Sequence, residues 1–126
     1  MRGPEPIRAL RVVATPAALD TIGVPVGAHV VRLAPDDALV VGAPDVTVAD
    51  PDAIVERDDG WVVWSLTEHD LATVIAPRVH WPLPAVRPAV APGLVAGVPA
   101  VLRLHQEWSW LLCSAVFAHE LAERLR

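Results

Sequence analysis

The sequence predicts an α+β fold in which an antiparallel sheet carries two helices on one face. Three observations support this prediction: β-branched segments that meet at reverse turns, two capped helical segments, and prolines that divide the chain into short elements. Strands that follow one another directly, rather than alternating with helices, favour antiparallel pairing. The order hairpin, helix, loop, hairpin, helix at the end of the chain resembles half of a ferredoxin-like fold.

The first 28 residues are expected to form an N-terminal extension to a domain that spans residues 29–126. Residues 1–6 are predicted to be a loose end, residues 7–14 a Val-rich strand, and residues 17–22 one helical turn. The extension therefore has weaker structural signals than the rest of the chain.

Three β-hairpins are predicted in the second part of the chain. The first joins residues 29–33 to 39–41 through Pro35-Asp36-Asp37, which has turn chemistry. The second joins residues 53–57 to 61–66 through Asp58-Asp59-Gly60, where Gly accepts a positive φ without steric cost. The third joins residues 99–105 to 108–113, with Gln106-Glu107 at the turn. Residues 78–92 contain four prolines and are expected to be extended rather than regular.

Two helices follow capping residues. Thr67 precedes two acids, and Leu71, Val74 and Ile75 fall at helical spacing before Pro77 ends the helix. Ser114 caps the second helix, predicted over residues 115–126, whose apolar stripe consists of Phe117, Leu121 and Leu125.

Charge and composition argue against two classes of partner. The net charge is −5 and no basic cluster occurs, so nucleic acid is not expected as a partner. The longest uncharged stretch, residues 88–102, is too short for a membrane helix and contains three prolines, so no membrane partner is expected either. Charges and prolines near the N-terminus interrupt any apolar signal segment. Together with the single cysteine, Cys113, this predicts a cytoplasmic protein.

No catalytic, cofactor-binding or metal-binding residues are predicted. The five histidines lack the spacing that metal sites use, and the glycines form neither a dinucleotide-binding motif nor a P-loop. No serine lies in a nucleophile motif, and Cys113 is expected to be a buried, inert thiol.

The tryptophans are the strongest candidates for a partner surface or a ligand pocket. Alternation places Trp61 and Trp64 on opposite faces of their strand, whereas Trp108 and Trp110 share a face. A domain of this size has room for few fully buried indoles, and indole is enriched at interfaces. The interface or pocket candidates are therefore Trp61, Trp64, Trp81, Arg103, Trp108 and Trp110.

Several segments, in the same order, resemble the small gamma subunit of heterotetrameric sarcosine oxidase and, behind it, the folate-binding aminomethyltransferase superfamily. LAPDDALVVG at residues 33–42 is similar to the family's LxPDEWLLxG, and SAVFAH at residues 114–119 to its RSFAxYL. Residues 61–75 resemble the family's strand and helix, residues 79–83 stand in the place of its CPLDL, and residues 90–125 follow its final segments. Glu68-His69-Asp70 replaces the family's Ser-Gly-Pro. The resemblance implies an aminomethyltransferase-like half as the fold.

The resemblance implies a non-catalytic accessory subunit of a multisubunit flavin-dependent amine oxidase or demethylase that acts on an N-methylated amine such as sarcosine. Larger flavoprotein and folate-domain subunits would then be the partners, and FAD, FMN, NAD and tetrahydrofolate would be bound there rather than by this chain. The alternative is a stand-alone small-molecule-binding or cyclase-like domain, whose Trp-lined pocket would use Arg103 as its polar anchor. Whether the chain itself catalyses a reaction is left open.

Overall fold

A computed structural model describes residues 1–126 and contains two compact units. One unit consists of Met1–Pro6 with Gly60–Arg126, and the other of Ile7–Asp59. A strand from the first 28 residues lies inside the sheet of unit Ile7–Asp59. The division into an extension of residues 1–28 and a domain of residues 29–126 stays a prediction.

Unit Ile7–Asp59 contains a four-stranded antiparallel sheet in the order β3-β4-β2-β5. Its elements are β2 (Ala9–Val13), α1 (Pro16–Asp20), β3 (His29–Ala34), β4 (Asp37–Val41) and β5 (Ile54–Arg57). The predicted hairpin of residues 29–41 is confirmed as β3 and β4, and the first predicted strand as β2. The core of this unit contains Leu10, Val12, Leu19, Ala38 and Val40, together with smaller residues.

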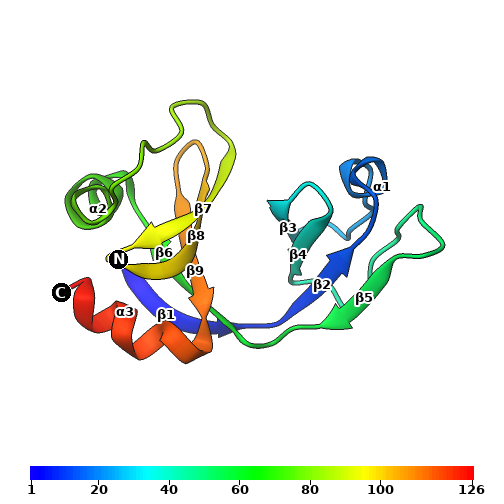
Figure 1. Ribbon diagram of the computed structural model, residues 1–126, viewed down its shortest axis with the longest axis horizontal. Helices are drawn as coiled ribbons and strands as arrows, with labels where there is room; N and C mark the ends of the chain where they lie inside the picture. The colour runs from blue at the N-terminus through cyan, green and yellow to red at the C-terminus, as the bar shows by residue number, and fades with distance from the viewer. The chain divides into compact units, whose positions relative to one another are not determined.

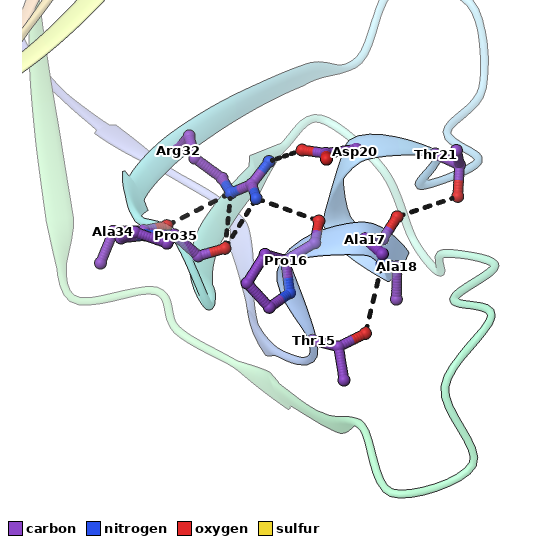
Figure 2. A network of polar contacts seen from close by, with 9 residues as sticks. All are labelled: Thr15, Pro16, Ala17, Ala18, Asp20, Thr21, Arg32, Ala34 and Pro35. Carbon is purple, nitrogen blue, oxygen red and sulfur yellow. Dashed lines mark hydrogen bonds and ion pairs between the residues drawn. The ribbon is translucent and has the colours of Figure 1, made fainter.

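Arg32 organises the polar side of this unit (Figure 2). Its guanidinium donates to Asp20 Oδ1 at 2.9 Å and to three backbone carbonyls, those of Pro16, Ala34 and Pro35. The helix that supplies Pro16 and Asp20 begins at a cap in which Thr15 Oγ1 accepts from the Ala18 N–H. One side chain thus ties α1 to the turn between β3 and β4.

The other unit contains a five-stranded sheet in the order β1-β6-β9-β8-β7, in which β7, β8 and β9 form a meander (Figure 1). The strands are β1 (Arg2–Ile7), β6 (Trp61–Leu66), β7 (Ala89–Val95), β8 (Val98–Leu104) and β9 (Ser109–Ser114). The predicted hairpin of residues 99–113 is confirmed as β8 and β9. The turn between β7 and β8 has two residues, Ala96 and Gly97, both with positive φ, as a type I′ turn requires.

The helical segments of this unit all pack on one face of the sheet. They are α2 (Glu68–Asp70), the π-helical turn η1 (Leu71–Ile75), the 3₁₀ turns η2 (Ala76–Arg78) and η3 (Ala115–Phe117), and α3 (Ala118–Arg124). Leu71, Ile75 and Leu121 meet the sheet residues Trp64 and Leu111 in the core of the unit. The predicted α+β class, with helices on one face of an antiparallel sheet, is confirmed, although the strands form two sheets.

The N-caps predicted from sequence are confirmed. Thr67 and Asp70 form a capping box, in which each side chain accepts from the other residue's backbone N–H. Ser114 Oγ accepts from the Val116 N–H at the start of η3. Beyond η1, the helical path continues into η2 although Pro77 lacks an N–H to donate.

Three local predictions are wrong. Residues 53–66 do not form a hairpin, because β5 pairs with β2 whereas β6 pairs with β9. Residues 1–6 are not a loose end, because β1 pairs with β6 at the edge of the five-stranded sheet. Within residues 78–92, Ala89 begins β7, and Pro92 is tolerated there because β7 is an edge strand. No helix of the structure is both long enough and apolar enough to cross a membrane.

Candidate functional site

The helix-free face of the five-stranded sheet carries a row of four residues that face one another across four strands. Strand register places Ser65 of β6 opposite Trp110 of β9, Trp110 opposite Arg103 of β8, and Arg103 opposite Val90 of β7. Directly paired residues lie on the same face of a sheet. An arginine and a tryptophan are therefore neighbours because of register alone.

Arg103 lies close to two indole rings at the end of the β8–β9 hairpin. Its guanidinium carbon is 5.4 Å from the ring centroid of Trp110 and 5.6 Å from that of Trp108. The two indoles contact each other at 5.3 Å between centroids, and the His105 ring stacks on Trp108 at 4.4 Å with an interplanar angle of 5°. We call Arg103, His105, Trp108 and Trp110 the Arg103 cluster. The two distances from the guanidinium carbon to the ring centroids fall within the range of cation–π attraction.

The charge of Arg103 is poorly compensated. The side chain is half-buried, and its Nη1 is shielded from solvent without any hydrogen-bond acceptor. Burial lowers the pKa of Arg103 from its ordinary value because desolvation disfavours the charged form.

The other arginines of the chain have different surroundings. Arg78 donates to the backbone carbonyls of Val74, Arg124 and Arg126, and Arg8 is exposed. The remaining seven form ion pairs with carboxylates: Arg2, Arg11, Arg32, Arg57, Arg87, Arg124 and Arg126. Arg103 is thus the half-buried arginine that has aromatic neighbours in place of an acid.

A shallow groove of about 330 Å³ lies beside the cluster and shares Trp108 with it. Its lining residues are Met1, Arg2, Ser65, Leu66, Thr67, Asp70, Glu107 and Trp108. The backbone N–H of Thr67 and the Met1 amino group, 2.9 Å away, hold the pKa of Asp70 down at about 2. The groove wall therefore carries an ionised carboxylate at neutral pH.

Trp64 is a core residue. Its side chain is 2% exposed and packs among Leu66, Leu102 and Leu111 on the helix-covered face. It therefore offers no surface to a partner or a ligand, and the candidate set loses one member. Alternation correctly places Trp64 and Trp61 on opposite faces, and Trp64 lies on the face that the helical segments cover.

Trp81 covers the edge strand β7 instead of projecting from the proline-rich segment. Its indole Nε1 donates to the Leu94 carbonyl at 2.9 Å, and its ring lies so close to Gly93 that a Cβ there would come within 2.7 Å. The ring is partly buried against the core. Its visible role is to close one edge of the sheet.

Trp61 begins β6, where register pairs it with Ser114. It lies on the same face as the Arg103 row but at the opposite end of its strand pair, since Ser65 is the residue of β6 that meets Trp110. The structure thus brings together Arg103, Trp108 and Trp110 from the predicted set, and separates them from Trp61, Trp64 and Trp81.

Sequence reasoning did not single out His105 or Ser65. His105 could have been found by aligning the predicted strands around the Gln106-Glu107 turn, because this alignment places His105 beside Trp108. The position of Ser65 in the row depends on the pairing of β6 with β9. These two strands are more than forty residues apart in the sequence, so no local pattern predicts that they pair.

Reactive groups do not converge elsewhere in the chain. No group of three or more His, Cys, Asp or Glu side chains comes together in a way that could hold a metal ion. Cys113 lies fully buried in the core, and burial raises the pKa of its thiol to about 11, so the nucleophilic thiolate is scarce at neutral pH. The Arg103 cluster therefore offers a cation beside two aromatic rings.

Comparison with known proteins supports the fold. No family model matches the chain, and no curated protein matches it by sequence. Among solved structures, the chain is similar to a chain of the heterotetrameric sarcosine oxidase from Corynebacterium sp. U-96 in complex with pyrrole 2-carboxylate, with a TM-score of 0.73 and 15% sequence identity. The similarity covers 97% of this chain and 79% of that chain. At this level of identity, the match establishes a shared fold.

Proposed function

We propose that this protein is a non-catalytic, gamma-type accessory subunit of a multisubunit flavin-dependent amine oxidase or demethylase. The observation that carries the proposal is the fold similarity over 97% of the chain to one chain of a heterotetrameric enzyme. The ordered segments at residues 33–42, 61–75 and 90–125, which resemble the gamma subunit of sarcosine oxidase, support it independently of the fold.

The enzyme complex would oxidise an N-methylated amine such as sarcosine. FAD, FMN, NAD and tetrahydrofolate would bind to the larger flavoprotein and folate-domain subunits, and this chain would contribute packing surface. Four members of the predicted interface set suit this role, because arginine and tryptophan are enriched at the centres of protein interfaces. They are Trp61, Arg103, Trp108 and Trp110.

Co-expression with the neighbouring genes tests the proposal. A tag on this chain should recover a complex that absorbs at flavin wavelengths and produces hydrogen peroxide or formaldehyde from sarcosine. Omitting this chain should reduce the yield or stability of the complex rather than alter its flavin spectrum. Recovery of the tagged chain as a folded monomer, with no flavoprotein bound, would reject the proposal.

The alternative is a stand-alone small-molecule-binding or cyclase-like domain. The observation that favours it is the open groove of about 330 Å³ beside Trp108. Titration of the isolated chain with a panel of metabolites, followed by tryptophan fluorescence, separates the two functions. Saturable binding of a metabolite at micromolar concentration supports the alternative, whereas the accessory function predicts none.

A further inference from the structure

The outer edge of β5 is open to pairing with another strand. β5 pairs with β2 on one side and has no strand on the other, and each of its residues is exposed (Figure 1). It contains no proline, and its register with β2 has no irregularity. The β-branched side chains Ile54 and Val55 are 54% and 43% exposed. An exposed edge with these properties is a template for a further strand.

The other three sheet edges are each protected. β1 contains two prolines, and β3 pairs irregularly with β4 after Arg32. β7 contains Pro92, and the indole of Trp81 donates to its backbone. Proline, irregular pairing and a covering side chain are devices that keep edge strands from pairing with other chains. β5 therefore differs from every other edge strand of the chain.

The free backbone groups of this edge belong to Val55 and Arg57. The Asp58 N–H donates to the Ala9 carbonyl, so these two residues form a hydrogen-bonded pair at the end of the β2–β5 ladder. Hydrogen-bonded and non-hydrogen-bonded pairs alternate along an antiparallel ladder. Glu56 is therefore bonded to β2, whereas the N–H and C=O groups of Val55 and Arg57 point away from β2, towards the open side.

These alternating donors and acceptors match the backbone of an extended peptide strand. A strand that pairs with Val55 and Arg57 bonds to the N–H and the C=O of each, as in other cases of strand addition to a sheet edge. The sheet of this unit is antiparallel throughout, and antiparallel pairs are slightly more stable than parallel ones. An antiparallel strand is therefore the expected occupant.

A second copy of β5 fits this edge poorly. The register that uses every free group pairs Val55 with Arg57 of the second copy, and this register sets Glu56 directly opposite Glu56. Like charges in directly opposite positions destabilise a strand pair. The register centred on Val55 instead pairs Arg57 with Ala53, whose N–H already donates to the Asp50 carbonyl. A strand from a different protein avoids both faults.

The side chains of β5 determine which partner strand is complementary. Opposite charges in directly opposite positions stabilise a strand pair, so Glu56 favours a base and Arg57 an acid. Register places Ile54 beside Val13 on one face, and both side chains are exposed. A partner residue opposite Ile54 would therefore join an apolar surface.

We propose that β5 is the docking edge for an extended strand of a partner protein, which adds to the four-stranded sheet in antiparallel direction. In the direction of its own chain, the partner strand presents an acid opposite Arg57, a base opposite Glu56, and apolar residues opposite Val55 and Ile54. The contact is defined by backbone geometry and charge, so its failure would leave the accessory-subunit function standing.

Two peptides of the same composition test the contact on the isolated chain. Ac-Thr-Glu-Lys-Val-Ile-Thr-amide sets its acid opposite Arg57 and its base opposite Glu56, whereas Ac-Thr-Lys-Glu-Val-Ile-Thr-amide exchanges the two charges. In ¹H–¹⁵N spectra, the first peptide should shift the amide signals of Val55 and Arg57 with at least five-fold higher affinity than the second. Equal affinity, or shifts confined to other residues, would reject the contact.

Backbone pairing is tested by removing single N–H groups. N-methylation of the peptide's Val removes a donor that faces β5 and should abolish binding, whereas N-methylation of its Lys, whose N–H faces away, should leave binding unchanged. On the protein, Val55→Pro removes an N–H of the open side and should abolish binding, and Val55→Thr, which keeps this N–H, is the control. If Val55→Pro does not fold, the N-methylated peptides decide.

Two further outcomes would also overturn the proposal. Equal binding of the two N-methylated peptides would show that the backbone of the peptide is not paired with β5. Sedimentation that reveals a dimer of the chain, together with increasing protection of the Val55 amide from hydrogen exchange as the concentration rises, would identify a second copy as the occupant.

Discussion

The guanidinium carbon of Arg103 lies 5.4 Å from the ring centroid of Trp110, on neighbouring strands where register makes the two residues direct partners. On the helix-free face of the sheet, the arginine is therefore paired with an indole ring and not with a carboxylate. Substitution of Arg103 by an uncharged residue therefore shows how the buried charge affects the free energy of unfolding.

Arg103→Met is expected to stabilise the isolated chain by about 1 kcal/mol. The substitution removes a buried nitrogen that has no acceptor. Such a nitrogen destabilises the folded wild-type chain by about 1–3 kcal/mol. The lost cation–π attractions, about 0.5–1 kcal/mol each, are partly replaced by sulfur–aromatic contacts of similar size. Urea unfolding measures the difference, and Arg8→Met serves as the matched control. A variant clearly less stable than the wild type would indicate that aromatic attraction outweighs desolvation.

Gly93→Ala is expected to destabilise the chain by about 1–3 kcal/mol, the usual cost of overpacking. The added Cβ would lie 2.7 Å from the indole of Trp81, whose ring is held by its bond to the Leu94 carbonyl. In a Trp81→Leu background, the same substitution should be neutral or stabilising, because alanine has less backbone freedom to lose than glycine. Chemical unfolding of the four proteins in this double-mutant cycle gives the coupling. An equal cost in both backgrounds would contradict the steric explanation.

The Thr67–Asp70 capping box should make stability depend on pH in the acid range. Because the pKa of Asp70 is lowered to about 2, its contribution is fully present above the unfolded value near 4 and is lost as the pH falls towards 2. Asp70→Ala should cost about 1 kcal/mol at pH 7, because it removes the acceptor of the Thr67 N–H. The difference in free energy of unfolding between wild type and Asp70→Asn should shrink between pH 4 and pH 2.

Urea titrations at several pH values measure this dependence. Asp36→Asn is a suitable control, because Asp36 is exposed in a turn. If the difference in free energy of unfolding between wild type and Asp70→Asn stays constant down to pH 2, the charge of the Asp70 carboxylate does not contribute to stability.

Cys113 should be unreactive in the native chain. With a pKa of about 11, only about a thousandth of the thiol is ionised at pH 8, and full burial blocks access. A colorimetric disulfide reagent such as DTNB should therefore modify it only after denaturation. A Val116→Cys variant provides the control, because the Val116 side chain is exposed and should supply one rapidly reacting thiol. Rapid reaction of the native wild-type chain would mean that β9 opens locally.

Local sequence patterns were sufficient where the partner of a segment lies nearby in the chain. The hairpin of β3 and β4, the hairpin of β8 and β9, and the caps at Thr67 and Ser114 follow from turn and capping chemistry within a few residues. The same register placed Arg103 beside Trp108 and Trp110, which the sequence proposed as part of one site.

Tertiary structure decided the pairings between distant segments. Asp58-Asp59-Gly60 has the chemistry of a hairpin turn, yet the Asp58 N–H donates to the Ala9 carbonyl and the Gly60 carbonyl accepts from the Ala115 N–H, so the strands on either side join different sheets. The glycine and prolines of residues 89–95 do not favour a strand in the sequence. The segment forms β7 because β8 pairs with it, and Pro92 is tolerated because β7 lies at the edge of the sheet.

The sequence by itself therefore determined the α+β class, the helix caps, two hairpins and the aromatic composition of the candidate site. Only the tertiary structure decided that Trp64 belongs to the core, that Trp81 closes a sheet edge, and that Arg103 is left without a carboxylate. The physical reason is that turns and caps are local contacts, whereas burial and charge compensation depend on which distant strands meet.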